Sequence, residues 1–318
     1  MGMDAPHLVG LGGIGTALAV DLIRGGTRVV VVEKNPKKVE AARRDGLAVD
    51  GLTVPCPDTR QFDDWSPPVG SVVFLCTKCF DNREVLNRLP EGVTLVPVQN
   101  GFDPDLDAFR HSLEGIASFV SECEPDRPWT RITRKGCLHF GHRRGTEPHP
   151  LFGPLAEALE RGKLFPVKRV PVIEPYKYSK LMYNAAISPL AAAAGIDNGQ
   201  LLSHPVARRL FFDLLQENYA ILEGAGIDLG KVGPFHPRTV AKILRRRWVA
   251  RLLSWAFEPS LRGTYCSMAP DLPKGRTEIG NYNRHLIRVA GSTPCPLNRA
   301  VVELLERADR ERIPPPPP

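Results

Sequence analysis

The sequence predicts an α/β protein with an N-terminal Rossmann-type dinucleotide-binding domain and a C-terminal all-helical domain. Three observations predict it: a glycine-rich turn between an apolar strand and a helix, further apolar strands downstream, and helical periodicity from about residue 173 onward. With 318 residues, the chain exceeds the length at which one hydrophobic core usually keeps growing. We therefore expect domains at 1–172 and 173–310, followed by a proline-rich tail at 311–318.

The main evidence for nucleotide binding is a Gly-x-Gly-x-x-Gly turn that follows the first apolar strand and precedes a helix over 16–24. Gly10 permits the tight turn, Gly12 lets the main chain approach a pyrophosphate, and Gly15 lets the helix pack close to the strand. The free N–H groups at the helix start then face the phosphates. The residues expected to hold the cofactor at this turn are Gly10, Gly12, Gly13, Ile14 and Gly15.

A second buried strand, over 28–32, ends in Glu33. A carboxylate at this place is positioned to accept hydrogen bonds from the adenosine ribose hydroxyls. The same carboxylate would repel the 2′-phosphate of NADPH, whereas Lys34, together with Lys37 and Lys38, is close enough in sequence to offset it. The residues alone leave both NADH and NADPH open as the cofactor.

Two further buried strands, over 71–76 and 93–98, are followed directly by polar residues. In an open parallel sheet, ligands bind outside the carboxyl ends of the strands, so these residues are expected to face the cofactor. They are Thr77, Lys78, Asn100 and Gly101. The other elements expected before residue 173 are a helix over 36–44, short strands over 47–49 and 52–54, and antiparallel strands over 116–122, 137–141 and 165–170.

The C-terminal domain is expected to contain helices over 176–194, 205–223, 237–255, 277–290 and 296–310. Within the third, apolar residues recur at helical spacing from Val240 to Trp255, so the arginines at 245–247 can occupy an opposite, solvated face. Amphipathic packing therefore accounts for this basic cluster without a polyanion.

Composition and charge exclude several classes of protein. Hydrophobic residues make up 42% and charged residues 24%, as in ordinary globular enzymes. No apolar run reaches the roughly 18 residues of a membrane span, and no leader precedes the first strand, so we expect a cytoplasmic protein without membrane contact. The net charge of +7 comes without a nucleic-acid-binding motif. No nucleic-acid partner is therefore expected. Of the seven cysteines, Cys76 and Cys79 form a Cys-x-x-Cys pair, but no second pair supplies the remaining ligands of a zinc site, so no metal is expected.

The residues that could do chemistry in the helical domain lie on one predicted helix. Lys180, Asn184 and Ser188 are successive i, i+4 neighbours, so an ammonium, a carboxamide and a hydroxyl share one face. Glu278 lies in the first turn of a later helix, where the helix dipole favours a carboxylate. The residues alone do not separate a catalytic face from a solvated stripe, or a functional glutamate from a surface charge.

Taken together and in order, these pieces resemble the ketopantoate reductase family over residues 7 to about 305. The matching pieces are the glycine-rich turn, Thr77-Lys78, Gln99-Asn100-Gly101, Lys180-x-x-x-Asn184, Asp197-Asn198-Gly199, Ser267-Met268-x-x-Asp271 and Arg276-Thr277-Glu278-Ile279. The resemblance implies NADPH-dependent reduction of 2-dehydropantoate to pantoate, a step towards coenzyme A.

The resemblance also implies roles for individual residues. Lys180 matches the proton donor, and a cation there would stabilise the charge that hydride delivery leaves on a keto oxygen. Lys78 and Asn100 match cofactor contacts. The residues matching those that hold the substrate are Asn184, Asn198, Ser267 and Glu278, with Ser188 on the same helix face.

Three departures from the family pattern bear on substrate and cofactor. Ser188 stands where the family usually has asparagine, Gly280 where it has aspartate, and Glu33 where NADPH-dependent members carry a basic residue. A reductase of another keto acid in a specialised pathway is therefore an alternative, as is a non-catalytic nucleotide-sensing homologue. The helical domain could also pair in a homodimer.

Overall fold

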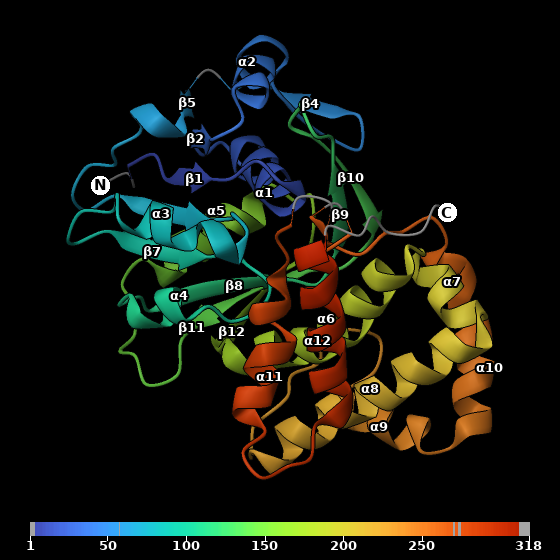
Figure 1. The fold of residues 1–318 in the computed structure, drawn as a ribbon. Coiled ribbons are helices and arrows are strands. Elements are labelled where there is room, and N and C mark those ends of the chain that lie inside the picture. The colour runs from blue at the N-terminus through green and yellow to red at the C-terminus, as the bar shows by residue number, and fades with distance from the viewer. Residues whose placement is uncertain (1–3, 57, 270, 273–274, 312–318) are drawn as a thin grey trace. The chain divides into compact units, whose positions relative to one another are not determined.

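The computed structural model describes residues 4–56, 58–269, 271–272 and 275–311. They divide after Glu174 into two compact units, the first α/β and the second helical (Figure 1). This division into an N-terminal Rossmann-type unit and a C-terminal helical unit confirms the predicted fold class. Of the predicted proline-rich tail at 311–318, Glu311 ends the last helix and 312–318 lie outside the described residues.

The first unit is built on a parallel sheet with strand order β5-β2-β1-β6-β7. Its strands are β1 (His7–Val9), β2 (Val30–Glu33), β5 (Thr59–Gln61), β6 (Val72–Leu75) and β7 (Thr94–Pro97). β1 pairs in parallel with both β2 and β6, so the chain changes direction across the sheet at this point. A doubly wound sheet binds its ligands at such a switch point, beyond the carboxyl ends of the strands.

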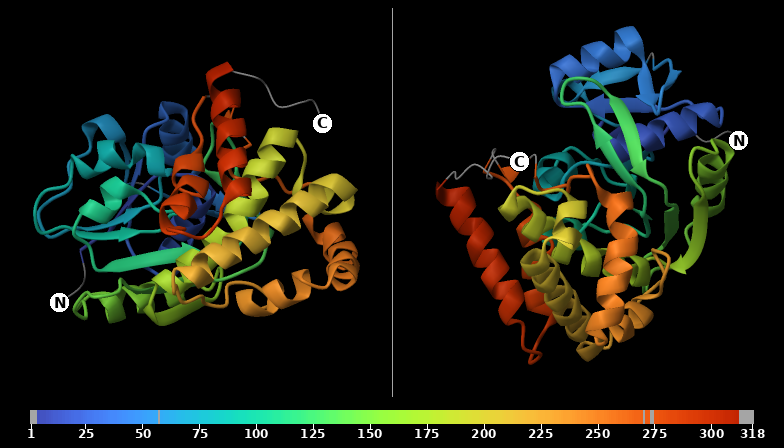
Figure 2. Two further views of the ribbon diagram at one scale, coloured as in Figure 1. Left: turned by 60° about the horizontal axis from the view of Figure 1, so that its bottom comes forward. Right: turned by 90° about the vertical axis from the view of Figure 1, so that its right-hand side faces the viewer.

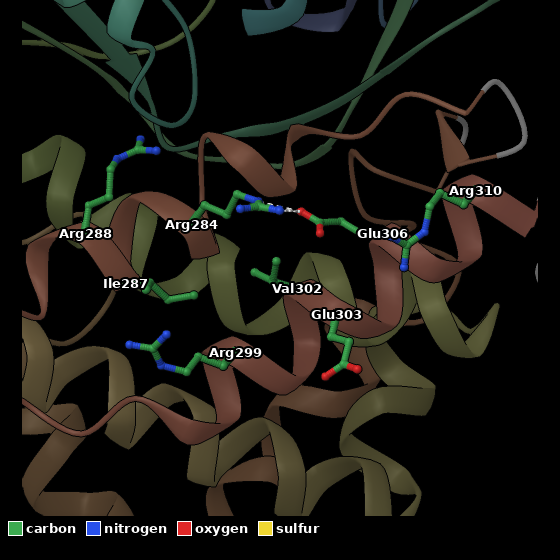
Figure 3. Close-up of a pocket in the computed structure, with 8 residues that line it drawn as sticks. All are labelled: Arg284, Ile287, Arg288, Arg299, Val302, Glu303, Glu306 and Arg310. Atoms are coloured by element: carbon green, nitrogen blue, oxygen red, sulfur yellow. Dashed lines mark hydrogen bonds and ion pairs between the residues drawn. The ribbon is translucent and has the colours of Figure 1, made fainter.

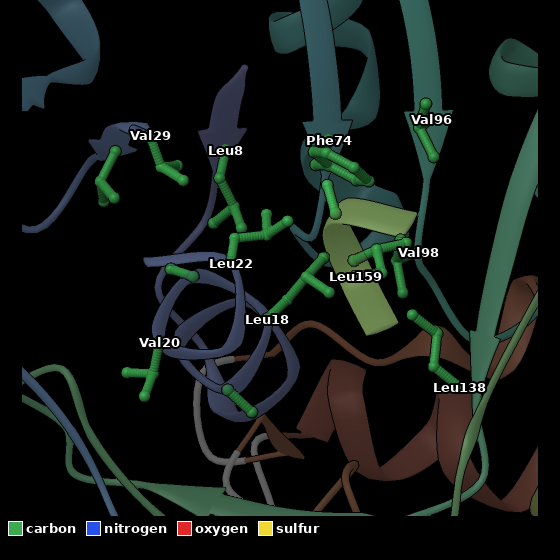
Figure 4. Packing of buried hydrophobic residues seen from close by; sticks show 14 of the residues in the cluster. Leu8, Leu18, Val20, Leu22, Val29, Phe74, Val96, Val98, Leu138 and Leu159 are labelled. Carbon is green, nitrogen blue, oxygen red and sulfur yellow. The ribbon is translucent and has the colours of Figure 1, made fainter. Parts of the chain in front are cut away.

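Side chains of the central strands alternate between two hydrophobic clusters, as the period of a β-strand requires. Leu8 and Phe74 belong to the cluster that includes α1 (Figure 4). Val9 and Leu75 belong to a second cluster with the buried Trp65. Burial on both faces explains why these strands read as continuous apolar runs in the sequence. The two clusters hold the strand ends in fixed positions.

Two smaller sheets complete the first unit, with strand orders β4-β3-β10-β9 and β12-β11-β8. Their strands are β3 (Leu47–Val49), β4 (Leu52–Val54), β8 (Leu113–Ala117), β9 (Val120–Cys123), β10 (Trp129–Arg134), β11 (Leu138–His142) and β12 (Val167–Val172). The helices of this unit are α1 (Gly13–Arg24), α2 (Pro36–Asp45), α3 (Asn82–Leu86), α4 (Pro104–Ala108) and α5 (Phe152–Arg161).

The antiparallel arrangement predicted for residues 116–170 is wrong in two respects. The strand predicted over 116–122 is divided between β8 and β9, which belong to different sheets. β11 pairs with β12 in parallel, because helix α5 lies between them in the chain and supplies the crossover that a parallel pair needs. The sequence prediction contained no helix there.

Asp21 is an ionisable residue that is fully buried within α1. Its Oδ1 accepts a hydrogen bond from the Leu164 backbone N–H at 2.8 Å, and burial raises the pKa of the carboxyl to about 6. Because the folded protein binds this proton more tightly than the unfolded chain, protonation of Asp21 stabilises the fold. The contribution is complete at pH values below the unfolded-state pKa and is lost as the pH rises through the folded-state pKa.

The variant Asp21→Asn removes this titration and keeps an acceptor for Leu164. Between pH 4 and pH 7 the wild type should therefore lose about 2–3 kcal/mol of unfolding free energy relative to the variant. Urea unfolding of both proteins across this range measures the difference. A difference that does not change with pH would contradict the assignment.

The second unit consists of α6 (Glu174–Ala194), α7 (Asn198–Ser203), α8 (Pro205–Gly224), α9 (Pro237–Leu244), α10 (Arg247–Phe257), α11 (Asn283–Val289) and α12 (Pro296–Glu311), with a 3₁₀ turn over Glu278–Gly280. Helix α6 begins at the last residue of the first unit. In place of the single helix predicted over 277–290, the structure has the 3₁₀ turn followed by the shorter helix α11. None of the helices among the described residues has the length and apolar character to cross a bilayer.

The prediction of a single helix over 237–255 is wrong, because the helix is interrupted between α9 and α10. Helix α10 turns its small residues, Ala250 and Ser254, inward. Three of its large apolar residues are exposed to solvent: Trp248 by 68%, Leu252 by 58% and Trp255 by 80%. The face of α10 that was expected to lie in the core is therefore exposed to solvent.

Candidate active site

The glycine-rich turn joins β1 to α1 with the geometry that the sequence predicts. Gly10 has a φ of +98°, a conformation that favours glycine, and its N–H donates to the Val32 carbonyl at 2.9 Å. A Cβ on Gly15 would overlap the Gly10 carbonyl oxygen, so the helix approaches the turn as closely as only glycine allows. A Cβ on Gly12 would meet no described atom within 4 Å. The turn thus leaves room beside Gly12 for a ligand, as a pyrophosphate requires.

Gly13 begins α1, with Ile14 in its first turn, and Gly13 lies against the β9 strand. A Cβ at Gly13 would be 2.6 Å from the Ser121 Oγ. Gly12 is the N-cap of α1 and has no side chain to occupy the free N–H groups of the first turn. These groups and the helix dipole are available to an anion.

Glu33 ends β2, where the sequence expects an acceptor for ribose hydroxyls. Its Oε2 accepts from the Leu11 N–H at 2.7 Å, and its Oε1 accepts from the N–H groups of Lys34 and Asn35 at 2.8 and 2.9 Å. The carboxylate therefore ties the glycine-rich turn to the end of β2. Two carboxylate oxygens offer about four acceptor positions, so one remains for a ligand hydroxyl.

The carboxyl ends of β6 and β7 are held together by a buried amide pair. Gln99 and Asn82 exchange hydrogen bonds of 2.7 and 3.1 Å through their side chains, and Gln99 Nε2 also donates to the Thr77 carbonyl at 2.7 Å. Lys78 follows Thr77 and is half-buried. The pair thus fixes the backbone from which the predicted cofactor residues project.

Asn100 follows Gln99 at the end of β7, before Gly101, which has a positive φ of 78°. The Cys79 Sγ lies 3.2 Å from the Asn100 carbonyl oxygen and connects the two strand ends. Within the described part of the chain, the Asn100 Oδ1 is buried without a hydrogen-bond partner. Because a buried polar atom of this kind is costly, its position suits a ligand that donates a hydrogen bond.

In the second unit, helix α6 carries Lys180, Asn184 and Ser188 at the predicted spacing. Lys180 and Asn184 are half-buried, so the fully solvated stripe that the sequence left open does not form. Ser188 is buried, and its carbonyl oxygen lies 3.3 Å from the Cys266 Sγ. This contact brings the loop that contains Ser267 to helix α6.

Two other predicted residues lie on segments that pack in the same unit. Asn198 starts α7, and its N–H donates to the Thr264 carbonyl at 2.9 Å, which ties α7 to the Ser267 loop. Among the described residues, the Asn198 Oδ1 is buried and has no hydrogen-bond partner. Glu278 is buried in the 3₁₀ turn before α11, with the Tyr282 hydroxyl 3.3 Å from its Oε2. The second unit thus links α6, Asn198 and the Ser267 loop through hydrogen bonds.

Helix α6 contains a proline, Pro189, which cannot donate to the carbonyl of Ala185 one turn earlier. Asn283 of α11 replaces the missing donor, since its Nδ2 donates to the Ala185 carbonyl at 2.8 Å. The same Nδ2 also donates to Asn298 at 2.9 Å, and Asn298 in turn contacts Asn218 of α8. A buried asparagine network therefore supports the helix segment that carries Asn184 and Ser188.

We expect Asn283→Ala to lower the unfolding free energy by about 1–3 kcal/mol, because it leaves the Ala185 carbonyl buried without a donor. Pro189→Ala is the matched control, since it returns a backbone N–H to this carbonyl. In the double variant the loss caused by Asn283→Ala should shrink. A double-mutant cycle by chemical denaturation measures this coupling, and additive effects would rule out the proposed replacement.

An open pocket of about 570 Å³ lies between α11 and α12 of the second unit (Figure 3). It is lined by Arg284, Ile287, Arg288, Arg299, Val302, Glu303, Glu306 and Arg310. Arg284 points across it to an ion pair with Glu306. None of the predicted site residues lines this pocket.

Sequence reasoning missed the residues that position the site rather than contact a ligand. Asn82 lies in α3, after β6. Lys38, which the sequence placed only as a charge near Glu33, lies in α2, and its Nζ donates to the Leu11 carbonyl at 2.8 Å. Asn283 is also missed, because its hydrogen bond to the Ala185 carbonyl joins positions 98 residues apart. Gln99 was adjacent to a predicted residue, but its hydrogen bonds to Asn82 join positions 17 residues apart. No local pattern signals such pairings.

A parallel sheet with this glycine-rich turn, followed by an all-helical unit, is the architecture of a nicotinamide-dependent oxidoreductase. Two family models match the chain: ketopantoate reductase PanE/ApbA over residues 7–125, and ketopantoate reductase PanE/ApbA C terminal over residues 172–309. The chain belongs to the ketopantoate reductase family and is an NAD(P)-dependent oxidoreductase.

Two relatives named 2-dehydropantoate 2-reductase match along almost their whole length. The protein from Pyrobaculum aerophilum is 26% identical over 308 residues, covering 94% of this chain and 96% of the relative. The protein from Aquifex aeolicus is 22% identical over 311 residues, covering 94% and 95%.

Solved structures share the fold. A PanE/ApbA family ketopantoate reductase from Ralstonia eutropha has a TM-score of 0.75 at 20% identity, covering 96% of this chain and 99% of its own. A D-mandelate dehydrogenase with NADH and anilino(oxo)acetate has a TM-score of 0.76 at 17% identity and the same coverage. This fold is therefore found with more than one keto acid chemistry.

Proposed function

We propose that the protein reduces a 2-keto acid with a nicotinamide dinucleotide, and that the substrate is 2-dehydropantoate, reduced to pantoate on the route to coenzyme A. The observation that carries this proposal is the match to 2-dehydropantoate 2-reductases across 94% of the chain. The ordered motifs in both units support it, because Lys180, Asn184 and Glu278 retain the residue types that the family uses.

The proposed roles follow from the chemistry of reducing a ketone. When bound, the dinucleotide supplies a hydride to the keto carbon. The Lys180 ammonium donates a hydrogen bond to the keto oxygen, stabilises the negative charge that develops there and supplies the proton. Glu278 accepts a hydrogen bond from a substrate hydroxyl and thereby orients the substrate.

The remaining substrate contacts are polar and neutral. Asn184, Ser188 and Ser267 are proposed to orient the substrate carboxylate, which their N–H and O–H groups suit. Asn198 is proposed to accept from a substrate hydroxyl, because its Oδ1 is buried and unpartnered among the described residues. In the first unit, the glycine-rich turn, Thr77, Lys78 and Asn100 are proposed to hold the cofactor.

Purified protein mixed with reduced cofactor and 2-dehydropantoate tests the proposal directly. The absorbance of the reduced nicotinamide should fall, and pantoate should accumulate in equal amount. Absence of turnover with both NADH and NADPH would overturn pantoate production. Omission of the keto acid is the control for background oxidation.

A second candidate is the reduction of another branched or larger keto acid. Ser188 favours it, since its side chain is shorter than the usual asparagine and changes the volume beside α6. A panel that includes aryl and branched keto acids distinguishes the two by kcat/KM. A non-catalytic sensor would bind the cofactor and turn over no member of the panel.

We also propose that the chain forms a homodimer. A ketopantoate reductase from Staphylococcus aureus with the same fold is described as dimeric, at a TM-score of 0.72. Light scattering during gel filtration measures the mass in solution. A single species of 35.1 kDa would exclude the dimer.

A further inference from the structure

The environment of the ribose position contains five basic residues within the first unit, and each of them has a partner. The first is Lys34, directly after Glu33. Its Nζ lies 2.9 and 2.7 Å from the two carboxylate oxygens of Glu84 on α3. This hydrogen bond is the main cause of the raised pKa of Lys34, with further contributions from Asp81 and Asp63. The lysine is thus surrounded by carboxylates.

Lys37, in the first turn of α2, also forms an ion pair with a carboxylate. Its Nζ lies 2.8 Å from the Oδ2 of Asp126, in the turn between β9 and β10. Asn35 also donates to Asp126, at 3.3 Å, and to the Pro125 carbonyl at 3.1 Å. Figure 2 shows this hairpin in green beside α2 in blue, so the contacts join two segments that are far apart in sequence.

The third lysine, Lys38, is almost fully buried and points towards the glycine-rich turn. Its Nζ donates to the Leu11 carbonyl at 2.8 Å and lies 3.4 Å from the Cys123 Sγ. Two neighbouring arginines are also engaged: Arg60 forms an ion pair with Asp58, and Arg127 stacks on the Trp129 ring at 4.8 Å.

We propose that the protein selects NADH over NADPH, and that Glu84 and Asp126 determine this specificity together with Glu33. Glu33 supplies the acceptor for a ribose hydroxyl. Glu84 and Asp126 neutralise Lys34 and Lys37, which a 2′-phosphate would otherwise contact. The inference rests on the proposed nucleotide site of the first unit, but not on the identity of the keto acid.

The charges explain the direction of the preference. A phosphate monoester carries between about −1.5 and −2 charges at neutral pH, whereas a ribose hydroxyl carries none and can donate to a carboxylate. At this position the phosphate would meet the charge of Glu33 and would compete with Glu84 and Asp126 for their lysines. Each of these costs opposes NADPH and leaves NADH unaffected.

The exposure of the ion pairs sets the size of the effect. Lys34 and Glu84 have side-chain exposures of 60% and 45%, so solvent screens their attraction. A single pair of this kind therefore contributes little, and two pairs are expected to change the ratio of the two affinities by about three- to tenfold. The charge of Glu33 accounts for the rest of the expected preference for NADH over NADPH.

The test is the Kd of NADH and of NADPH, measured by nicotinamide fluorescence on the full chain without keto acid. The wild type should bind NADH at least about tenfold more tightly than NADPH. In the double variant Glu84→Gln, Asp126→Asn, both side chains keep their size but lose their charge. The Kd of NADPH should fall about three- to tenfold, while that of NADH stays within about twofold.

Glu160→Gln is the matched control, because Glu160 pairs with Arg169 at 2.8 and 2.6 Å on the surface of the same unit. It should leave both constants unchanged. Calorimetry with 5′-ADP and 2′,5′-ADP isolates the phosphate effect, and the gain of the double variant should shrink at high salt.

A wild type that binds NADPH as tightly as NADH would overturn the selectivity. A ratio that is the same in the double variant and in Glu160→Gln would overturn the assignment to Glu84 and Asp126. Because no keto acid is present, a protein that shows the selectivity but reduces no keto acid contradicts only the proposed function.

Discussion

Replacement of Lys180 with alanine is expected to lower kcat with the keto acid by about 10²- to 10⁴-fold and to leave the Kd of the reduced cofactor within about twofold. The ammonium is proposed to act on the keto oxygen, where negative charge develops only as the hydride arrives. Removing it therefore costs stabilisation of the transition state. The proposed cofactor residues, among them Glu33 and Asn100, lie in the other unit of the chain and remain intact.

Two variants distinguish loss of the proton donor from loss of a charge. Lys180→Arg keeps a cation but holds its proton too tightly to donate it near neutral pH, so it should recover the KM of the wild type more fully than its kcat. Lys242→Ala, at an exposed lysine of α9, is the control and should leave kcat unchanged. Unchanged turnover in Lys180→Ala, with the thermal transition preserved, would exclude Lys180 as the donor.

The elements that the sequence predicts well are those determined by local rules. The turn between β1 and α1 can be predicted because only glycine fits it. The polar residues after β6 and β7 can be predicted because strand periodicity marks where each strand ends. The strand ends follow because burial on both faces requires continuous apolar residues. The carboxyl ends of the sheet could therefore be located without coordinates.

The predictions that fail depend on contacts between distant segments. Nothing in the sequence around Arg245 indicates that the helix is interrupted there. Nor does it indicate that α10 packs through Ala250 and Ser254 instead of Trp248. Similarly, the parallel pairing of β11 with β12 depends on a crossover helix that periodicity did not reveal. Tertiary packing overrides the local pattern in both cases.

The site shows the same limit in its charges. The sequence places Lys34 and Lys37 beside Glu33 and suggests that they offset it, whereas in the structure their partners are Glu84 and Asp126, 50 and 89 residues away. The net field at the ribose position is therefore set by segments that a local count of charges omits. The proposed preference for NADH rests on this arrangement of charges, which the sequence alone did not reveal.

Alanine substitutions at Gly12 and Gly15 are expected to separate ligand contact from packing. A Cβ on Gly12 meets no described atom within 4 Å, so Gly12→Ala should leave the unfolding free energy within about 1 kcal/mol of the wild type. The same methyl group would occupy the space that a pyrophosphate needs beside the turn. The Kd of the cofactor should therefore rise at least about tenfold, which fluorescence titration measures.

Gly15→Ala should behave in the opposite way, because its Cβ would overlap the Gly10 carbonyl oxygen and lie 3.0 Å from the Cys76 Cβ. Helix α1 would have to move away from β1, which opens the core around Leu18 and costs about 1–3 kcal/mol of unfolding free energy. Gly26→Ala is not a suitable control, since Gly26 has a φ of +79°. Gly153→Ala is suitable, because a Cβ there has open space and an ordinary backbone. If Gly12→Ala unfolded as readily as Gly15→Ala, the open space beside Gly12 could not be assigned to a ligand.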